Sequence, residues 1–395
     1  DLNQVLKWAS REMRREIEKR PDGLSDMQFG FRKHRTTHQA ILSTTSMIDI
    51  AHQARIGFAT ADADCRAAFD CVIPEIIRLA LIANGVPETM VRFMYSHLTQ
   101  TKFQVCAGGF ISDEQYGGED QSFGSGQGGG ASGANWVLNQ DFINRALEAA
   151  ESQASIIRHP ITHEIATNNG IVFADDLNQV SMDTTRKRSD AENLESLRKA
   201  AQLNNDCLRA SGGSLNIQKC AFRHLSMNNK GKCNDVPNSA ITIIPSTNSV
   251  PQPIARMLRT QHQRILGVHI APSLKTTAQY DILEQKCKVF KTAINNNPLH
   301  PSHLRIATNQ YIHPSIGYPL VAQRLTTARI DKLQGIPLAA TLGRVNLSTK
   351  MSRALVFLPA SKGGAGMIHW SSVNLARQIQ LVTTTYNSPS NIGFL

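Results

Sequence analysis

The 395-residue sequence has no apolar run of about 18 residues, the length that a membrane-spanning helix needs. Its N-terminal segment, DLNQVLKWASREMRREIEKR, lacks the apolar core of a secretory signal peptide. Its seven cysteines are scattered and form no CxxC pair, which argues against a disulfide framework. We therefore expect an intracellular protein, in the nucleus or the cytoplasm and not secreted, with no membrane partner.

Several common ligand-binding signatures are also missing or incomplete. The chain has no GxxxxGK[ST] sequence, which argues against an NTPase phosphate loop. Gly124, Gly126 and Gly129 satisfy GxGxxG, but the preceding residues EDQSF form no buried strand, as a dinucleotide-binding fold would require. A zinc site among the cysteines and histidine of 220–233 is conceivable, but the paired short spacings of such sites are absent.

The chain has an excess of positive charge. It contains 42 Lys and Arg against 31 Asp and Glu, a formal net charge of +11. In a protein without membrane segments, this excess most often marks a polyanionic partner such as nucleic acid. A basic surface without such a partner is the alternative.

Hydrophobic periodicity and turn signals predict a mixed helix and strand chain. The predicted helices cover 4–20, 37–54, Pro74 to Gly85, 87–98, a segment with Val137, Leu138, Phe142 and Ala146 on one face, 190–210, and most of the chain from 278. The predicted strands are FATADAD (58–64), TKFQVCAGG (101–109) and both arms of a hairpin in NGIVFADDLNQV (169–180). The polar segment 226–258 is predicted to be a surface loop.

Acidic residues stand at two of these predicted strand ends. Asp64 ends one strand, and Asp175 and Asp176 occupy the turn of the hairpin. An acidic pair in a turn is usually only solvated. Nucleotidyl transfer, however, uses two Mg²⁺ ions about 3.5–4 Å apart, held by carboxylates that converge from separate segments. The two clusters together could meet that requirement.

Further motifs accompany these acids in a fixed order. They are QFGFRKHRTT (28–37), DCRAAFD (64–70), GQGGGASG (126–133), FADD (173–176), GSLNIQK (213–219), ILGV (265–268) and LPASKGGAGM (358–367). The first six resemble, in order and spacing, the fingers and palm motifs of reverse transcriptases, especially those of non-LTR retrotransposons and group II introns. The last, LPASKGGAGM, more loosely resembles the LP…GGLGL element found after the thumb region of non-LTR elements. The likeness covers residues 1–270 well and the remainder weakly.

By this resemblance, Asp64 and Asp175 are catalytic metal ligands, and Asp176 is a supporting carboxylate of the same metal site. Asp62 competes for the role of Asp64, because residues two apart on a strand face the same way. The interval to the AFD tripeptide favours Asp64. Asp70 would then be structural.

The same resemblance implies a nucleotide-binding set. Phe69 takes the place of the residue beneath the sugar, although it could instead simply pack in the palm core. Gln127 and Gly128 look like the QG that contacts the incoming nucleotide, and Arg32 looks like the fingers cation that grips the triphosphate. Gly133 stands where the family usually has proline, which implies a more flexible loop.

Two further roles follow from the resemblance. Lys219 resembles the catalytic lysine that can protonate the leaving pyrophosphate, with an ordinary surface lysine as the alternative. Leu266 and Gly267 resemble the hairpin that binds the primer end, with an ordinary buried strand as the alternative.

The resemblance implies an α+β fold, a right-hand polymerase with fingers, an antiparallel palm sheet flanked by helices, and a helical thumb. We expect fingers at 1–56, a palm at 57–272 with a fingers-type insertion near 85–125 and the surface loop at 226–258, and a helical thumb and post-thumb region at 273–395. Because the fingers motif begins so near residue 1, the chain looks like an excised core.

The expected activity is that of an RNA-directed DNA polymerase of a retroelement. Its expected cofactors are two Mg²⁺ ions, with Mn²⁺ as a substitute, and its expected partners are an RNA template, a DNA primer and dNTPs. One alternative is a decayed or domesticated copy that only binds nucleic acid. Another is an RNA-dependent RNA polymerase, although a bulky Phe69 would obstruct the ribose 2′-hydroxyl.

Overall fold

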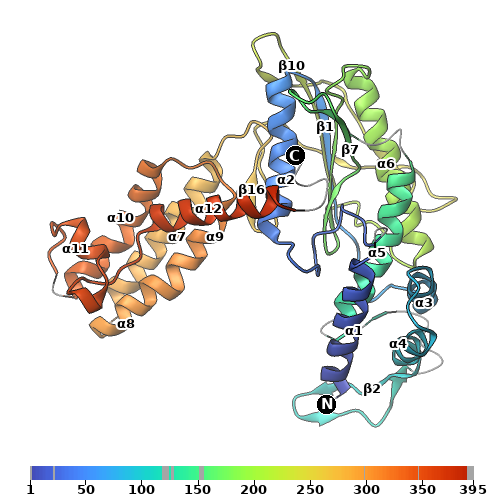
Figure 1. Cartoon of the computed structure of the whole chain (residues 1–395), viewed down its shortest axis with the longest axis horizontal. Helices are drawn as coiled ribbons and strands as arrows, with labels where there is room; N and C mark the ends of the chain where they lie inside the picture. The colour runs from blue at the N-terminus through green and yellow to red at the C-terminus, as the bar shows by residue number, and fades with distance from the viewer. Residues whose placement is uncertain are drawn as a thin grey trace. The chain divides into compact units, whose positions relative to one another are not determined.

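A computed structural model describes residues 2–20, 23–117, 124–125, 129–150, 155–297, 299–345 and 347–388 (Figure 1). The chain is a mixed helix and strand protein that divides into two compact units, one up to Leu258 and one from Arg259 onward. Each unit has its own hydrophobic core. Within the described ranges, no helix is long and apolar enough to cross a membrane.

The first unit is built on a six-stranded sheet. Across the sheet the strands are β11 (Cys233–Asp235), β10 (Ala221–Met227), β1 (Phe58–Ala63), β9 (Asp176–Ser181) and β8 (Ile171–Phe173), with β14 (Ala255–Arg256) also on β10. All pairs are antiparallel except β10 with β14. The predicted hairpin of 169–180 is thus confirmed as β8 and β9, and β9 is the strand that pairs with β1.

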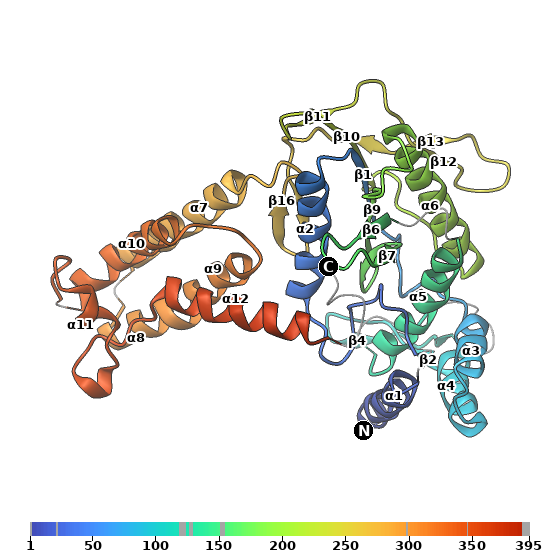
Figure 2. The same cartoon turned by 45° about the horizontal axis from the view of Figure 1, so that its top comes forward.

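Helices cover both faces of this sheet. Figures 1 and 2 show α2 (Thr37–Ala54) on one side and α5 (Ser132–Ala149) and α6 (Asp190–Ala210) on the other. The small side chains of Ala59 and Ala61 on β1 are buried in the core, where α6 packs on the strand. The remaining helices of this unit are α1 (Leu2–Glu18), α3 (Pro74–Ala83) and α4 (Glu88–Gln100).

The two helices predicted at 37–54 and 190–210 are confirmed with those bounds. Each begins with a reciprocal capping box, in which a hydroxyl residue and a residue three positions later satisfy each other's backbone N–H groups: Thr36 with Gln39, and Ser189 with Glu192. The local sequence therefore fixes where these helices start.

Three predictions about local structure are wrong. Residues 101–109 do not form one strand, because Gly108 and Gly109 adopt positive φ angles and turn the chain back between β3 (Cys106–Ala107) and β4 (Phe110–Ile111). The two-residue strand β2 (Lys102–Phe103) pairs instead with β5 (Tyr116–Gly117).

The segment 226–258 is more than a surface loop. It holds the end of β10, all of β11 and β14, and a two-stranded pair of β12 (Thr242–Ile243) and β13 (Gln252–Pro253), with Ile241 and Ile243 fully buried. Phe142 was expected on the buried face of its helix but is 50% exposed, while the adjacent Ile143 is buried. Another two-stranded pair joins β6 (Ser155–Arg158) and β7 (Ile165–Asn168).

The second unit is mainly helical, as predicted from residue 278 onward. It opens with the hairpin of β15 (Gln263–Ile265) and β16 (Val268–Ile270). Its helices are α7 (Thr277–Asn296), α8 (Pro301–Ile306), the π-helix η3 (Ala307–Ile312), α9 (His313–Val321), α10 (Thr327–Arg344), α11 (Arg353–Phe357), the short 3₁₀ helix η4 (Ala360–Lys362) and α12 (Trp370–Tyr386). The names fingers, palm and thumb remain predictions for these parts.

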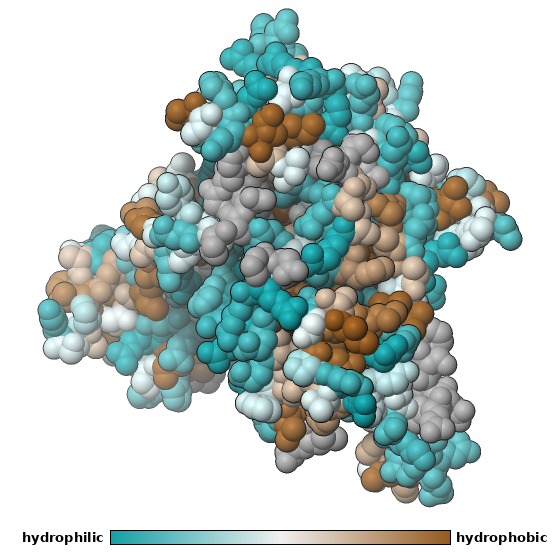
Figure 3. All heavy atoms as spheres, turned by 45° about the vertical axis from the view of Figure 1, so that its right-hand side comes forward, coloured by the Kyte–Doolittle hydropathy of each residue, from teal (hydrophilic) through white to brown (hydrophobic). Residues whose placement is uncertain are grey.

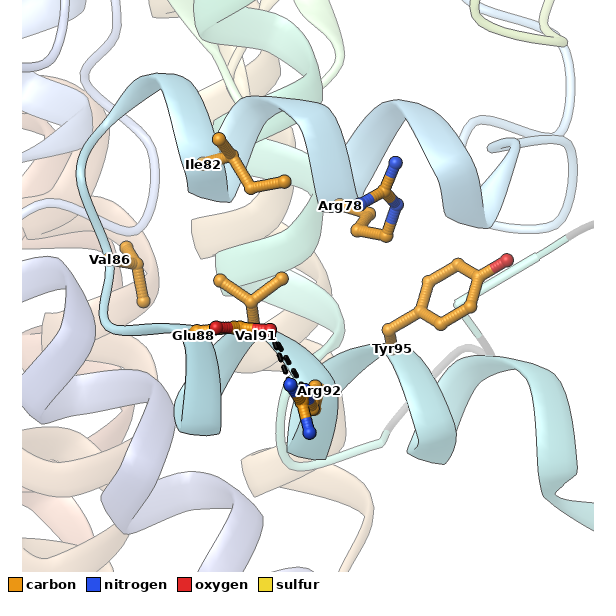
Figure 4. A pocket seen from close by; sticks show the side chains of 7 residues that line it. All are labelled: Arg78, Ile82, Val86, Glu88, Val91, Arg92 and Tyr95. Atoms are coloured by element: carbon orange, nitrogen blue, oxygen red, sulfur yellow. Dashed lines mark hydrogen bonds and ion pairs between the residues drawn. The ribbon is translucent and has the colours of Figure 1, made fainter.

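The protein surface is largely hydrophilic on the face in Figure 3, where apolar side chains gather in small groups. A cavity of about 430 Å³ lies between α3 and α4, with Ile82, Val86 and Val91 on its wall (Figure 4). The two arginines beside it, Arg78 and Arg92, are already paired with glutamates on their own helices. None of the predicted site residues lines this cavity.

Candidate active site

The sheet brings the two predicted acidic clusters together. β1 runs antiparallel to β9 with Ala63 opposite Leu177. Asp64 directly follows Ala63, and Asp176 directly precedes Leu177, so the two acids lie at the same end of this strand pair. Asp175 is in the two-residue turn just before Asp176, because Phe173 pairs with Asp176 across the hairpin.

The carboxylates are close enough to repel one another. Burial raises the pKa of Asp175, and the charge of Asp64 raises it further. Burial, followed by the charges of Asp175 and Asp64, raises the pKa of Asp176 to about 6. Burial and, after it, mutual repulsion therefore both disfavour the charged forms of these carboxylates.

Lys219 is the cation that lies beside this cluster. Its Nζ is 3.5 Å from Oδ2 of Asp64, and its side chain is 67% exposed. Its turn is tied to the same strand end, because the backbone N–H of Asn216 donates to the carbonyl of Asp64 and Lys219 N–H donates to the carbonyl of Asn216. The structure therefore places Lys219 at the acidic cluster on a largely solvent-exposed side chain.

Asp62, the competitor of Asp64, already has a partner. Its Oδ2 lies 3.3 Å from Nη1 of Arg223 on β10, and the two side chains are only 13% and 4% exposed. Burial raises the pKa of Asp62 to about 6, although Arg223 acts in the opposite direction. Asp62 is therefore part of a buried ion pair inside the sheet.

The segment 27–30 contacts the β8–β9 hairpin next to its turn. The backbone at Met27 and Phe29 exchanges hydrogen bonds with Val172 of β8, at 2.8 and 2.7 Å. Beyond it, Gly30 lies so close to the turn that an added Cβ would be 2.3 Å from the backbone nitrogen of Ala174. The indole N–H of Trp136 on α5 donates to the carbonyl of Ala174 at 2.8 Å. We call these three contacts the turn bracket.

Phe69 lies in an aromatic group next to this bracket. Its ring centroid is 6.4 Å from that of Phe31, edge-on, and 5.5 Å from that of Trp136. Phe69 is only partly buried and also packs against the main core, so the core-packing alternative has direct support. Phe31 is 45% exposed and has a positive φ of 57°, which is unusual for a bulky residue.

The glycine that replaces the usual proline has a steric role here. A Cβ on Gly133 would lie 2.8 Å from the ring of Phe31. Any larger residue at this position would require the Phe31 ring or the backbone beside it to shift. The expected increase in loop flexibility is not what distinguishes the position, since Gly133 lies in the first turn of α5.

Arg32 is held by the protein. It donates hydrogen bonds to the carbonyls of Leu24 and Ser25, and its Nε is 3.5 Å from Glu18, with the side chain 11% exposed. Its predicted contact with a triphosphate would have to compete with these partners and stays a prediction. Lys33, next in the sequence, is exposed.

Four more predicted site residues belong to other segments of the chain. Gln127 and Gly128 lie outside the described residues. Leu266 and Gly267 form the turn of the β15–β16 hairpin in the second unit, where the hydroxyl of Tyr318 donates to the carbonyl of Leu266 at 2.7 Å. Their role in primer binding stays a prediction.

The donor set suits a hard divalent cation, because carboxylate oxygens are the ligands that Mg²⁺ prefers. The raised pKa values of Asp175 and Asp176 also indicate repulsion that such a cation would relieve. In the described part of the chain, however, no three acidic, histidine or cysteine residues are gathered closely enough to hold a metal. The carboxylates therefore converge without forming a finished coordination shell.

Sequence reasoning missed Gly30 and Trp136 as parts of the site. Gly30 stands inside the fingers motif, and a glycine between aromatic residues could have signalled a close backbone approach. Trp136 gave no such signal, because its partner is the carbonyl of Ala174, 38 residues away in sequence.

No protein-family model and no curated protein matches the chain. Among solved structures, it is similar to apo telomerase from Candida tropicalis, with a TM-score of 0.40 and 9% identity, covering 99% of this chain and 58% of that one. It is also similar to two telomerases in complex with a TWJ fragment of telomeric RNA. The complex from Candida tropicalis has a TM-score of 0.37 and 11% identity, covering 98% of this chain and 54% of that one. The complex from Candida albicans has a TM-score of 0.36 and 8% identity, covering 99% of this chain and 56% of that one.

The chain thus spans little more than half the length of these telomerase chains. Identities and TM-scores of this size do not assign it to a family.

Proposed function

We propose that this chain is the core of an RNA-directed DNA polymerase of a retroelement, of the non-LTR or group II intron type. The observation that carries the proposal is the convergence of Asp64 with Asp175 and Asp176 at one end of the sheet, next to Lys219. These residues come from three separate motifs whose order resembles that of reverse transcriptases. A shared catalytic role explains why residues from three separate motifs meet at one end of the sheet.

In the proposed reaction, a primer 3′-hydroxyl attacks the α-phosphate of a dNTP. Asp64, Asp175 and Asp176 would hold two Mg²⁺ ions, which supply charge stabilisation and activate the hydroxyl. Lys219 presents an exposed ammonium group beside Asp64, where it can give a proton to the leaving pyrophosphate. Phe69 would lie beneath the sugar and exclude a 2′-hydroxyl.

The polyanionic substrates fit the charge of the chain. The formal net charge of +11 favours template and primer binding through phosphate contacts. Arg32 or its exposed neighbour Lys33 would contact the triphosphate. The RNA template, the DNA primer and the retroelement subtype rest on the motif resemblance.

The decisive experiment is primer extension on an RNA template with Mg²⁺, comparing the wild type with Asp175→Asn. We expect the substitution to lower extension by several orders of magnitude while template binding stays nearly unchanged, because a ligand is lost and the cationic surface remains. Asp206→Asn, an exposed carboxylate on α6, is the matched control and should extend normally.

The alternatives predict different results in the same assay. A decayed, binding-only copy would bind primer-template without extending it under any metal. An RNA polymerase would extend with rNTPs in preference to dNTPs. Equal extension by wild type and Asp175→Asn would refute the assigned ligand.

A further inference from the structure

Helix α1 (Leu2–Glu18) has one buried face and one outward face. Its buried apolar side chains are Leu6, Ala9, Met13 and Ile17, which recur at helical spacing, and Ser10 is buried on the same face. The residues at the centre of the opposite face are therefore those displaced by half a turn.

Trp8, Arg11 and Arg15 occupy that centre, at positions i, i+3 and i+7. The Trp8 side chain is 58% exposed. The chain has three tryptophans, and the other two, Trp136 and Trp370, are each only 1% exposed. More than half of the Trp8 side chain is open to solvent, so its ring is available to stack on a partner.

Cations flank the ring along the helix. Four cations follow one another at four-residue intervals, so they form a row along one side of the helix that turns gradually about its axis. They are Lys7, Arg11, Arg15 and Lys19. All of them are exposed or nearly so. This row passes beside Trp8.

The acidic residues on this face hold the cations only weakly. Glu12 lies 3.7 Å from Arg15, with side chains 41% and 62% exposed, and Glu16 pairs with Lys19 at comparable exposure. Exposed pairs of this kind contribute little, and a phosphate can take the place of the carboxylate.

The chemistry of the face selects the partner. A protein partner would need a continuous apolar patch, but among the side chains of this helix that the structure describes, Val5, at 49%, is the other exposed large apolar one. A single ring beside several cations fits one unpaired base stacked on the ring and phosphates held on both sides. A paired duplex would keep its bases stacked on each other and leave the ring unused.

We propose that the outward face of α1, centred on Trp8, Arg11 and Arg15, is a binding surface for single-stranded RNA. Under the proposed function, which identifies the RNA as template, this surface takes an unpaired stretch of template outside the polymerase site.

The first test measures tryptophan fluorescence of the full chain during titration with oligouridine. Trp136 and Trp370 are buried, so Trp8 is the tryptophan that RNA in solution can contact, and the same titration of Trp8→Ala separates its signal from theirs. We expect oligouridine to quench and shift its emission, and a blunt RNA duplex of equal length to have much less effect. No change in emission with oligouridine, or an equal change with duplex, would overturn the proposal.

The second test uses variants and an independent affinity measurement by RNA fluorescence anisotropy. Trp8→Ala should weaken oligouridine binding by about tenfold, the loss expected for one stacked base. Tyr386→Ala, which removes a side chain that is 75% exposed on α12, should leave binding unchanged. Equal losses of oligouridine affinity in Trp8→Ala and Tyr386→Ala would mean that Trp8 makes no specific contact with the RNA, and would contradict the proposal.

The charge test removes two cations. Arg11→Gln with Arg15→Gln should weaken binding and flatten its salt dependence, whereas Arg198→Gln with Lys199→Gln on α6 makes the same change in net charge and should have a much smaller effect. Equal effects would show that only net charge matters and would contradict a site on α1.

Primer extension separates this inference from the proposed function. If the chain is a polymerase, Trp8→Ala should raise the template concentration needed for half-maximal extension and leave the rate at saturating template unchanged. If wild type does not extend the primer at all, the proposed function is refuted. The proposed RNA-binding surface on α1 is then still tested independently by the fluorescence and anisotropy measurements.

Discussion

Replacing Gly30 with alanine should slow primer extension much more than it destabilises the protein. The new Cβ would lie 2.3 Å from the backbone nitrogen of Ala174 and 3.0 Å from its Cα. The backbone of Gly30 does not need a positive φ, so alanine suits it conformationally. The effect of the substitution is therefore a steric push on the turn that carries Asp175.

The size of the push can be worked out from these distances. Ordinary contact begins near 3.4 Å, so the two backbones must separate by about 1 Å. Overpacking of this kind costs about 1–3 kcal/mol of stability. A displacement of about 1 Å at a reacting group costs roughly a hundredfold in rate, or about 2.7 kcal/mol in the barrier. Since Asp175 directly follows Ala174, it should move with the turn.

The assay is single-turnover extension at saturating dNTP and Mg²⁺, with urea unfolding measured on the same preparations. We expect Gly30→Ala to remain folded and to lose about two orders of magnitude in rate. Gly335→Ala in α10 is the matched control, because nothing lies within 4 Å of its added Cβ. That control should gain about 0.5–1 kcal/mol of stability with an unchanged extension rate.

The reasoning would be refuted by a folded Gly30→Ala protein that extends at the wild-type rate. It would also fail if the rate dropped only in proportion to the unfolded fraction. Either result would mean that the turn bracket does not position Asp175.

Two further predictions concern the same strand end. Phe69→Val should raise rNTP incorporation relative to dNTP incorporation by on the order of tenfold if the ring excludes the 2′-hydroxyl, whereas an unchanged ratio with a general loss of activity would support the core-packing alternative. In metal-free protein, the pKa of Asp176 is raised to about 6, so the folded chain binds this proton more tightly than the unfolded chain, and the free energy of unfolding should fall as pH rises from about 4 to about 7. Asp176→Asn should flatten that slope in urea unfolding measured across this pH range, and an unchanged slope would assign the effect to other groups.

The sequence predicted best where structure depends on neighbouring residues. The helices at 37–54 and 190–210 were predicted with their observed bounds, since their capping boxes are written within four residues. The hairpin of 169–180 was also local, because its turn and both its strands lie in one short segment.

Prediction failed where distant residues decide the outcome. Ile241 and Ile243 are buried because they pack against the core of the first unit. Their neighbours in the sequence are mostly polar, so nothing in the local sequence signals this burial. The orientation of Phe142 depends on which side of α5 meets its neighbours, and that helix is buried around most of its circumference. Periodicity alone cannot identify the exposed side of such a helix.

The candidate site mixes both kinds of information. The motifs named Asp64, Asp175 and Lys219, but their convergence depends on the pairing of β1 with β9 and on the turn at 216–219, which are long-range features. The partners of Arg32 could not be predicted from the sequence either, because one of them, Glu18, lies in helix α1, 14 residues earlier in the chain. Residue types could therefore be predicted, whereas their contacts could not.

The choice between Asp62 and Asp64 brings these two kinds of information together. In the sequence the choice rests on an interval, because Asp64 has the required distance to Phe69. In the structure it rests on electrostatics, because Arg223 on β10 neutralises Asp62 inside the sheet, while Asp64 stands beyond the last paired residue of β1 and beside the hairpin acids. The cation near Asp64, Lys219, is on a mostly exposed side chain and can move aside for a metal ion. The buried Arg223 has no comparable freedom, so Asp62 stabilises the pairing of β1 with β10, and under the proposed function it is Asp64 that binds the metal.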